Sequence, residues 1–132
     1  MAIPNSPPRR YGSSKQLIAG DDFNKLNDEL NSFQSLTPGT NAQNTAFINA
    51  ANIELLTAAT GGVTMPISYP GAIVNILNNS GNAQNIFPAG TDQMQNAATT
   101  FAAASASISL ASGASATYFC IKTGFWQRAA TA

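Results

Sequence analysis

Short apolar segments separated by turn residues constrain this 132-residue chain more than any other feature. Between Ile53 and Trp126, apolar and β-branched runs recur about every 8 to 12 residues, with Gly, Pro, Asn or Ser between them. This spacing is typical of antiparallel sandwiches and jelly rolls, whereas parallel α/β folds need a helix between strands. The sequence therefore predicts a mainly β fold, an antiparallel, jelly-roll-like β-sandwich, over residues 37–132.

The predicted strands differ in how they are expected to be covered. The run Ala72–Leu77 is apolar at odd and even positions, which predicts a strand buried on both faces. Pro66 favours an edge position for the run that contains it, and Gly61-Gly62 is expected to form the turn before that run. The expected strand segments are 53–57, 63–68, 72–77, 84–87, 90–94, 107–110 and 115–122, with Phe125 and Trp126 closing the fold.

One amphipathic α-helix is predicted over residues 19–36, where Asp21 or Asp22 caps its first turn and Thr37-Pro38-Gly39 ends it. Its apolar residues recur at spacings of three and four and form a narrow stripe. Such a stripe fits either docking on the sheet or a seam between copies of the chain, and we expect it to be an oligomer interface. The stripe consists of Phe23, Leu26, Leu30 and Phe33.

Residues 1–18 are predicted to form an extended N-terminal arm, because prolines prevent a regular helix or central strand there. A frayed terminus is the simpler interpretation. The functional interpretation is a partner-binding segment, because prolines reduce the entropy lost on ordering and the apolar groups offer surface to bury. The candidate binding residues of the arm are Ile3, Pro4, Pro7, Pro8, Arg9, Arg10 and Tyr11.

The composition argues against several classes of function. Six basic and six acidic residues give a net charge of zero, and only 9% of residues are charged, so electrostatic binding to nucleic acid or to a membrane is not expected. The chain has no His, the commonest metal ligand and general base, so we expect no metal, no cofactor and no catalytic residues. The single Cys120 lies in an apolar pattern and is predicted to be a buried hydrophobe.

Two weaker alternatives remain from the residue patterns. Glu54 and Asp92 are the carboxylates outside the predicted helix, and a hydrolase would need them to face each other across a cleft. A sugar-binding platform would need aromatic residues on one exposed face. The favoured prediction instead places Phe119 or Tyr118, together with Trp126, in the core of the sandwich. The aromatic candidates are Tyr69, Tyr118, Phe125 and Trp126.

Neither a secretory signal nor a membrane-spanning run is recognisable in the sequence. Residues 1–10 lack the apolar core of a signal peptide, and the Ala-rich stretch 97–106 is interrupted by Thr and Ser. We therefore expect the protein to be made, and to fold, in a cytoplasm.

Three stretches of the chain carry a family resemblance. In the first, a predicted strand is followed by Asn78-Asn-Ser-Gly81 and then by a second strand that ends in Phe87-Pro-Ala-Gly90. In the other two, Leu110 and the turn Gly113-Ala-Ser115 precede an aromatic strand, and Trp126 closes the fold. This order resembles a β module of tailed-bacteriophage virion proteins, found in capsid decoration (cement) proteins, head fibres and some tail proteins. The stretches are residues 69–92, 108–119 and 124–127, and the span 69–127 that encloses them is a little under half of the chain.

The resemblance implies a structural protein of the virion. The arm, one helix and one β module account for this chain, which favours a decoration protein over a long fibre. The resemblance then implies a homotrimer on the capsid exterior that binds the major capsid protein and clamps neighbouring capsid subunits around packaged DNA. The alternative is a head-fibre or tail adhesin that binds host-surface carbohydrate.

Overall fold

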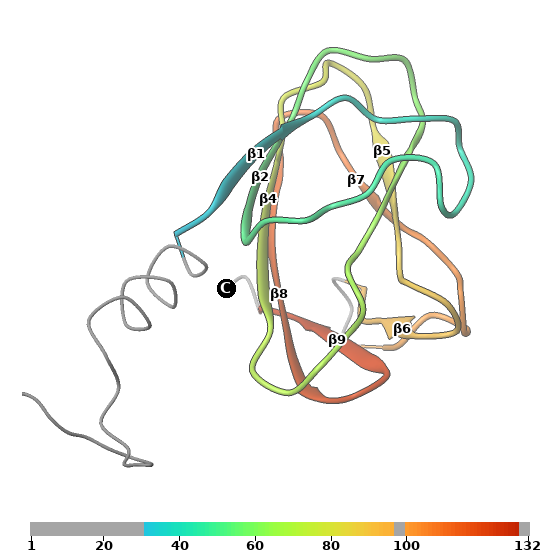
Figure 1. The fold of residues 1–132 in the computed structure, drawn as a ribbon. Coiled ribbons are helices and arrows are strands. Elements are labelled where there is room, and N and C mark those ends of the chain that lie inside the picture. Colours follow the sequence, from blue (N-terminus) through green and yellow to red (C-terminus); the bar gives the residue numbers. More distant parts are fainter. Residues whose placement is uncertain (1–30, 97–99, 130–132) are drawn as a thin grey trace, which may run out of the picture. The chain divides into compact units, whose positions relative to one another are not determined.

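The computed structural model describes residues 31–96 and 100–129, which contain nine strands and no helix. The strands form two sheets, here called the large sheet and the small sheet (Figure 1). This confirms the mainly β prediction. The large sheet contains β1 (Phe33–Leu36), β2 (Asn52–Leu55), β4 (Ile73–Asn78), β6 (Gln93–Met94), β8 (Ser115–Lys122) and β9 (Phe125–Arg128). The small sheet contains β3 (Gly62–Thr64), β5 (Gln84–Phe87) and β7 (Ile108–Leu110).

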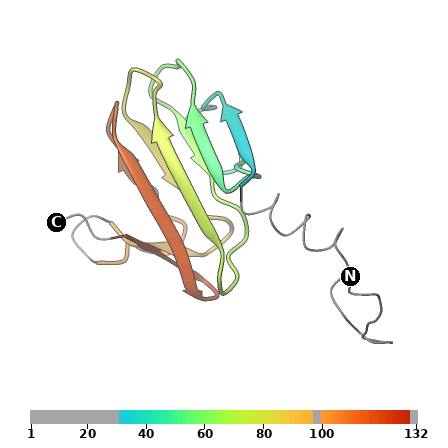
Figure 2. The ribbon, with the colours of Figure 1, turned by 90° about the vertical axis from the view of Figure 1, so that its left-hand side faces the viewer.

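The pairing of the strands is mixed, so the prediction of a wholly antiparallel fold was wrong. The order of the large sheet is β1-β2-β4-β8-β9-β6, with β1, β2, β4 and β8 side by side in Figure 2. The pairs β1–β2, β2–β4, β3–β5 and β6–β9 are parallel, and β4–β8, β5–β7 and β8–β9 are antiparallel. From β2 to β5 the chain alternates between the two sheets, so strands two apart in sequence become parallel neighbours.

The first strand corrects the predicted end of the helix. Residues Phe33–Leu36 pair in parallel with β2, so the predicted helix cannot extend to residue 36. The side chain of Gln34 fixes this extended segment, because its Nε2 donates to the carbonyl oxygen of Phe47 (3.1 Å) and its Oε1 accepts from the amide of Asn49 (2.9 Å). The spacing of Leu30 and Phe33 imitates a helical repeat across this boundary. The compact unit begins at Phe33 rather than at residue 37.

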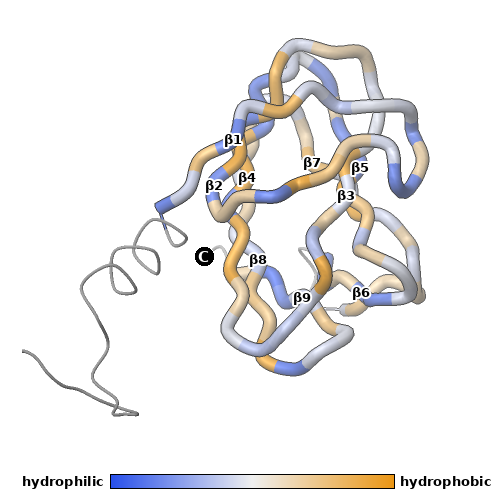
Figure 3. The backbone as a smooth tube through the Cα atoms, in the orientation of Figure 1, coloured by the Kyte–Doolittle hydropathy of each residue, from blue (hydrophilic) through white to orange (hydrophobic). Residues whose placement is uncertain are grey.

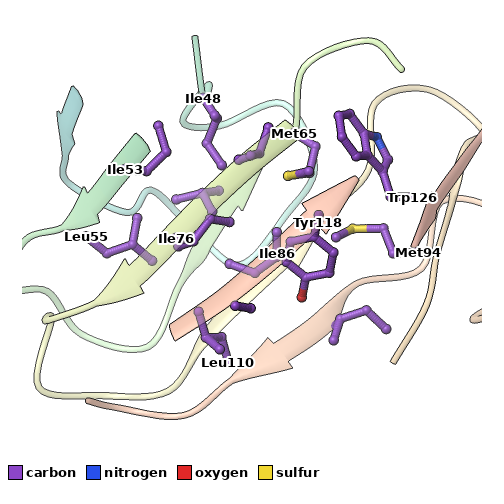
Figure 4. Close-up of a cluster of buried hydrophobic side chains, with 14 of the residues drawn as sticks. Ile48, Ile53, Leu55, Met65, Ile76, Ile86, Met94, Leu110, Tyr118 and Trp126 are labelled. Atoms are coloured by element: carbon purple, nitrogen blue, oxygen red, sulfur yellow. The ribbon is translucent and has the colours of Figure 1, made fainter. Parts of the chain in front are cut away.

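Side chains from both sheets form one hydrophobic core. Alternation along β4 places Val74 and Ile76 inside, where they join Ile86 of β5 and the fully buried Trp126 of β9 (Figure 4). Hydrophobic stretches occur in both sheets (Figure 3). Cys120 is buried in the same core, as predicted, and its burial raises the pKa of the thiol.

A buried polar network ties the end of β4 to the small sheet. The Asn78 Nδ2 lies 2.8 Å from the carbonyl oxygen of Leu110 in β7 and 2.8 Å from that of Asn82. Its Oδ1 accepts from the Ser80 hydroxyl at 2.7 Å, and Ser80 Oγ accepts in turn from Gln84 Nε2 at 2.9 Å. The Asn-x-Ser-Gly sequence is thus a structural link between strands, and the positive φ of Gly81 (88°) completes its turn.

Gly61 and Gly62, which were predicted to form a turn, also bring two backbone segments into contact. Gly62 begins β3, at an edge of the small sheet as the neighbouring Pro66 predicted. The amide of Gly39 donates to the carbonyl oxygen of Gly62 at 2.9 Å, so two backbone segments meet here. A Cβ atom on Gly61 would lie 2.0 Å from the carbonyl oxygen of Gly39. Gly61 is therefore required for close backbone approach.

Candidate interaction surface

The solvent-facing side of the large sheet, here called the outer face, carries regular rows of side chains. Strand register places Phe33, Asn52, Asn75 and Thr117 in one row across β1, β2, β4 and β8. The next row along the strands is Ser35, Glu54, Leu77 and Ser115. On the other side of the first row, Ile73 of β4 is opposite Phe119 of β8, and Ile121 follows on β8. Figure 2 views the sheet from this side.

Within the first row, the polar residues Asn52, Asn75 and Thr117 bind one another and form a ladder. The Thr117 hydroxyl donates to Asn75 Oδ1 at 2.8 Å, and Asn75 Nδ2 donates to Asn52 Oδ1 at 3.0 Å. These mutual bonds satisfy polar atoms that would otherwise require water. The ladder can therefore be covered by another molecule at a lower desolvation cost than unpaired amides and hydroxyls would impose.

Apolar side chains border the ladder and remain exposed. The exposed fractions are 64% for Phe33, 47% for Ile73, 44% for Leu77 and 67% for Ile121. The exposure of Ile73 and Leu77 shows that the prediction of β4 as a strand covered on both faces was wrong, because only its even positions face the core. The apolar residues at the odd positions belong to a surface.

Two shallow depressions lie on the outer face. One, of about 350 Å³, includes Phe33, Leu77 and the ladder residues in its lining. The other, of about 310 Å³, is lined by Ile73, Phe119 and Ile121 among others. Both are open and largely apolar, so their chemistry suits side chains of a protein partner better than a small polar ligand.

Charge is scarce on this unit. Residues 33–132 contain four charged side chains, namely Glu54, Asp92, Lys122 and Arg128. On the outer face, Glu54 Oε2 accepts from Asn79 Nδ2 at 3.1 Å. Lys122 ends β8 in phase with the buried positions of that strand, and its ammonium lies 5.2 Å from the ring centroid of Phe125. A surface with so few charges has little electrostatic protection against association.

The solvent-facing side of the small sheet has a different chemistry. Alternation places Asn85 of β5 and Ser109 of β7 away from the core. Asn85 Nδ2 donates to Asn41 Oδ1 at 2.7 Å, and Ser109 is exposed. No exposed large apolar side chain lies on β3, β5 or β7, so the exposed apolar rows on strands belong to the large sheet. Other exposed apolar side chains, among them Phe47, Ile67 and Tyr69, lie in connecting segments.

The structure brings one of the predicted site residues to this surface. Phe33, predicted as part of the helical stripe, lies instead on β1 at the edge of the outer face. The other predicted residues of the stripe and arm lie outside the described residues. They are Phe23, Leu26 and Leu30 of the stripe, and Ile3, Pro4, Pro7, Pro8, Arg9, Arg10 and Tyr11 of the arm.

The two alternative sites are not assembled as their chemistry would require. Glu54 lies on β2, near one edge of the large sheet, whereas Asp92 precedes β6 at the opposite edge, so the two carboxylates do not form a facing pair. Of the aromatic candidates, Tyr118 and Trp126 are fully buried, as favoured, while Tyr69 is exposed. The four aromatic residues therefore do not share one exposed face.

The residues that sequence reasoning missed are Ile73, Leu77, Phe119 and Ile121. Their signal was present as apolar residues at alternate positions of β4 and β8, in phase with Asn75 and Thr117. An apolar strand with polar residues inserted on one parity indicates a surface row, whereas a strand buried on both faces carries no such insertions.

Tyr118 gives a prediction about pH. Its hydroxyl is buried without a hydrogen-bond partner among the described residues, and burial raises its pKa above the usual 10.0, an effect that Arg128 partly opposes. Above pH 10 the unfolded chain releases this proton before the folded chain does, so the free energy of unfolding should fall by up to about 1.4 kcal/mol per pH unit. Tyr118→Phe removes this group and should flatten the fall.

Urea unfolding of both proteins between pH 7 and 11 tests this expectation. At pH 7 the Tyr118→Phe variant should be more stable by about 1 kcal/mol, because an unpartnered buried hydroxyl is removed. A variant that is less stable at pH 7, or that shows the same decline above pH 10, would contradict the assignment.

Further chemical features of the described residues are limited. No group of three His, Cys, Asp or Glu side chains in residues 31–96 and 100–129 is arranged to hold a metal ion. Within the same residues, no helix has the length and hydrophobicity needed to cross a membrane. Comparison of the chain with protein-family models, curated proteins and solved structures finds no match.

Proposed function

We propose that this protein is a structural component of a bacteriophage virion, a trimeric capsid decoration protein that clamps neighbouring major capsid subunits and stabilises the DNA-filled head. Two features support the proposal. The first is the resemblance of residues 69–92, 108–119 and 124–127 to the virion β module. The second is the outer face, the observation that carries the proposal, because a broad and nearly uncharged sheet face suits contact between proteins.

The proposal includes a more specific fold than two sheets. The large and small sheets would form a β-sandwich of jelly-roll-like shape with mixed strand pairing. Their shared core supports this description, because residues of both sheets belong to one buried cluster. The module would require neither a cofactor nor a metal, and it would act outside the shell, after synthesis in the host cytoplasm.

Multivalency would supply the clamping strength. Three subunits joined in one body present three binding segments, so binding by one segment raises the effective concentration of the other two at the capsid. The arm residues Ile3 to Tyr11 are the proposed capsid contacts, because they combine apolar, proline and arginine side chains. Each contact can then be weak while the whole trimer binds tightly.

The test uses capsids of the encoding phage purified without this protein. Added full-length protein should co-sediment with them to a saturating ratio and raise the temperature at which they release DNA. A chain lacking residues 1–15 should keep its fold and lose most of its capsid binding. Undiminished binding by the shortened chain would refute the role of the arm, and failure of the full-length chain to bind would refute the decoration role.

A carbohydrate-binding adhesin is the second candidate. The larger depression is mostly apolar, but one part of it supports this candidate, because Asn52, Glu54 and Thr117 place amide, carboxylate and hydroxyl groups near the exposed Phe33 ring. Glycan binding that Phe33→Ala abolishes, without any effect of the protein on capsid heat resistance, would support the adhesin over the decoration protein.

A further inference from the structure

We infer that the outer face of the large sheet is the surface through which copies of this chain bind one another. The apolar centre of this contact consists of Phe33, Ile73, Leu77 and Ile121, on both sides of the Asn52–Asn75–Thr117 ladder. The inference goes beyond the proposed function, because contact between copies in solution does not require a capsid.

The apolar area of the face matches what such a contact needs. With the exposed fractions given above and about 200 Å² for a large side chain, the four residues present roughly 400 Å² of apolar surface. A standard interface buries about 800 Å² per partner, of which somewhat more than half is apolar. The four side chains therefore supply most of the apolar share of one standard interface.

The charge of the face favours a second copy over a charged partner. A contact between copies brings identical surfaces, and therefore identical charges, into one assembly. Apart from Glu54, which Asn79 already binds, the rows of the outer face carry no charged residue. A partner recognised by charge would need complementary groups that this face does not offer.

The polar residues in the centre of the face do not oppose its burial. Asn75 lies between Asn52 and Thr117 and bonds to both, so the ladder keeps these hydrogen bonds when water is excluded. Leu77 lies two residues from Asn75 along β4, and Ile73 lies two residues away in the other direction. A partner that covers the apolar side chains must cover the ladder as well.

The low number of charged residues in the rest of the unit favours association through the outer face. With four charged side chains in residues 33–132, the unit falls far below the roughly 25–35% of charged residues that keep a domain surface monomeric. An exposed apolar area of this size equals the largest patch of a typical monomer, which is often a functional surface. Pairing with further copies covers it with a surface of the same composition.

The experiment is light scattering of the full-length chain after size-exclusion chromatography, over a hundredfold range of concentration. The full-length protein should have a mass at least twice the 13.7 kDa of one chain. Ile73→Arg places a charge in the smaller depression and should weaken association at least a hundredfold. Ile73→Ser removes the apolar group without adding charge and should weaken it about tenfold.

The matched control is Ser109→Arg, which adds the same charge at an exposed position of β7 on the small sheet. It should associate like the unchanged chain, and circular dichroism should show all three variants folded. A monomeric full-length chain, or an Ile73→Arg variant that stays assembled, would overturn the inference.

The capsid-binding assay separates this inference from the proposed function. A full-length monomer that still decorates capsids would refute the contact between copies and leave the decoration role standing. A chain that assembles through the outer face but does not bind capsids would support the contact between copies and refute the decoration role.

Discussion

Replacing Asn78 with alanine is expected to lower the free energy of unfolding by about 4 kcal/mol, because several buried polar groups lose their partner together. The Asn78 amide reaches the carbonyl oxygens of Leu110 and Asn82, and its own oxygen accepts from the backbone and hydroxyl of Ser80. Each buried group left unpaired costs about 1–3 kcal/mol, and the alanine leaves at least two such groups.

Urea unfolding followed by tryptophan fluorescence measures this loss through the buried Trp126. The matched control is Asn79→Ala, since Asn79 is adjacent, exposed and bonded only to Glu54 through its side chain in the described contacts. It should cost less than about 0.5 kcal/mol. Equal effects of the two substitutions would show that the network does not hold the sheets together.

The second large effect is expected from Gly61→Ala, which should destabilise the fold by about 3 kcal/mol or more. The added Cβ would meet the Gly39 carbonyl oxygen at 2.0 Å, a distance that only movement of the backbone relieves. Such movement would also disturb the bond from the Gly61 amide to Gln84 Oε1 (2.8 Å) and the backbone bonds between Gly39 and Gly62.

Gly81→Ala separates steric conflict from backbone strain in this prediction. Gly81 has a φ of 88° and open space where an added Cβ atom would lie, so its substitution adds strain alone and should cost about 1–2 kcal/mol. Chemical denaturation of both variants gives the comparison. A Gly61→Ala variant as stable as Gly81→Ala would contradict the close approach of the two backbone segments.

Local sequence patterns predicted the positions of several strands well. Strands β5 and β8 occupy residues 84–87 and 115–122, as expected from alternation bounded by turn residues. The burial of Cys120 and of Trp126 was also predicted, because both lie in dense apolar patterns. These features depend on residues close together in the chain, so one sequence is sufficient to predict them.

Features that depend on distant residues were not predictable in the same way. The parallel pairing of β2 with β4 arises because β3 lies between them in sequence but in the other sheet, and no local signal specifies that alternation. The strand character of Phe33 depends on bonds from Gln34 to a segment 13 to 15 residues away. Only the folded chain reveals these partners.

The outer face illustrates the same limit for the candidate site. The ladder bonds join Asn75 to Asn52, 23 residues away, and to Thr117, 42 residues away. No local motif in the sequence could therefore have revealed the ladder. Sequence reasoning assigned the oligomer interface to a helical stripe. Phe33, the one residue of that stripe within the part of the chain that the structure describes, lies on a strand of the outer face instead. The strand register places Phe33 on the same face of the large sheet as Leu77 and Ile73.

The number of copies of this protein in one virion tests the central claim most directly. Quantitative mass spectrometry of purified particles measures it against the major capsid protein. A trimer at every local three-fold position of a shell gives one copy per shell subunit, so a decoration protein should approach that ratio. A fixed ratio of this order is the predicted result, whereas a handful of copies per particle, or none, would contradict the decoration role.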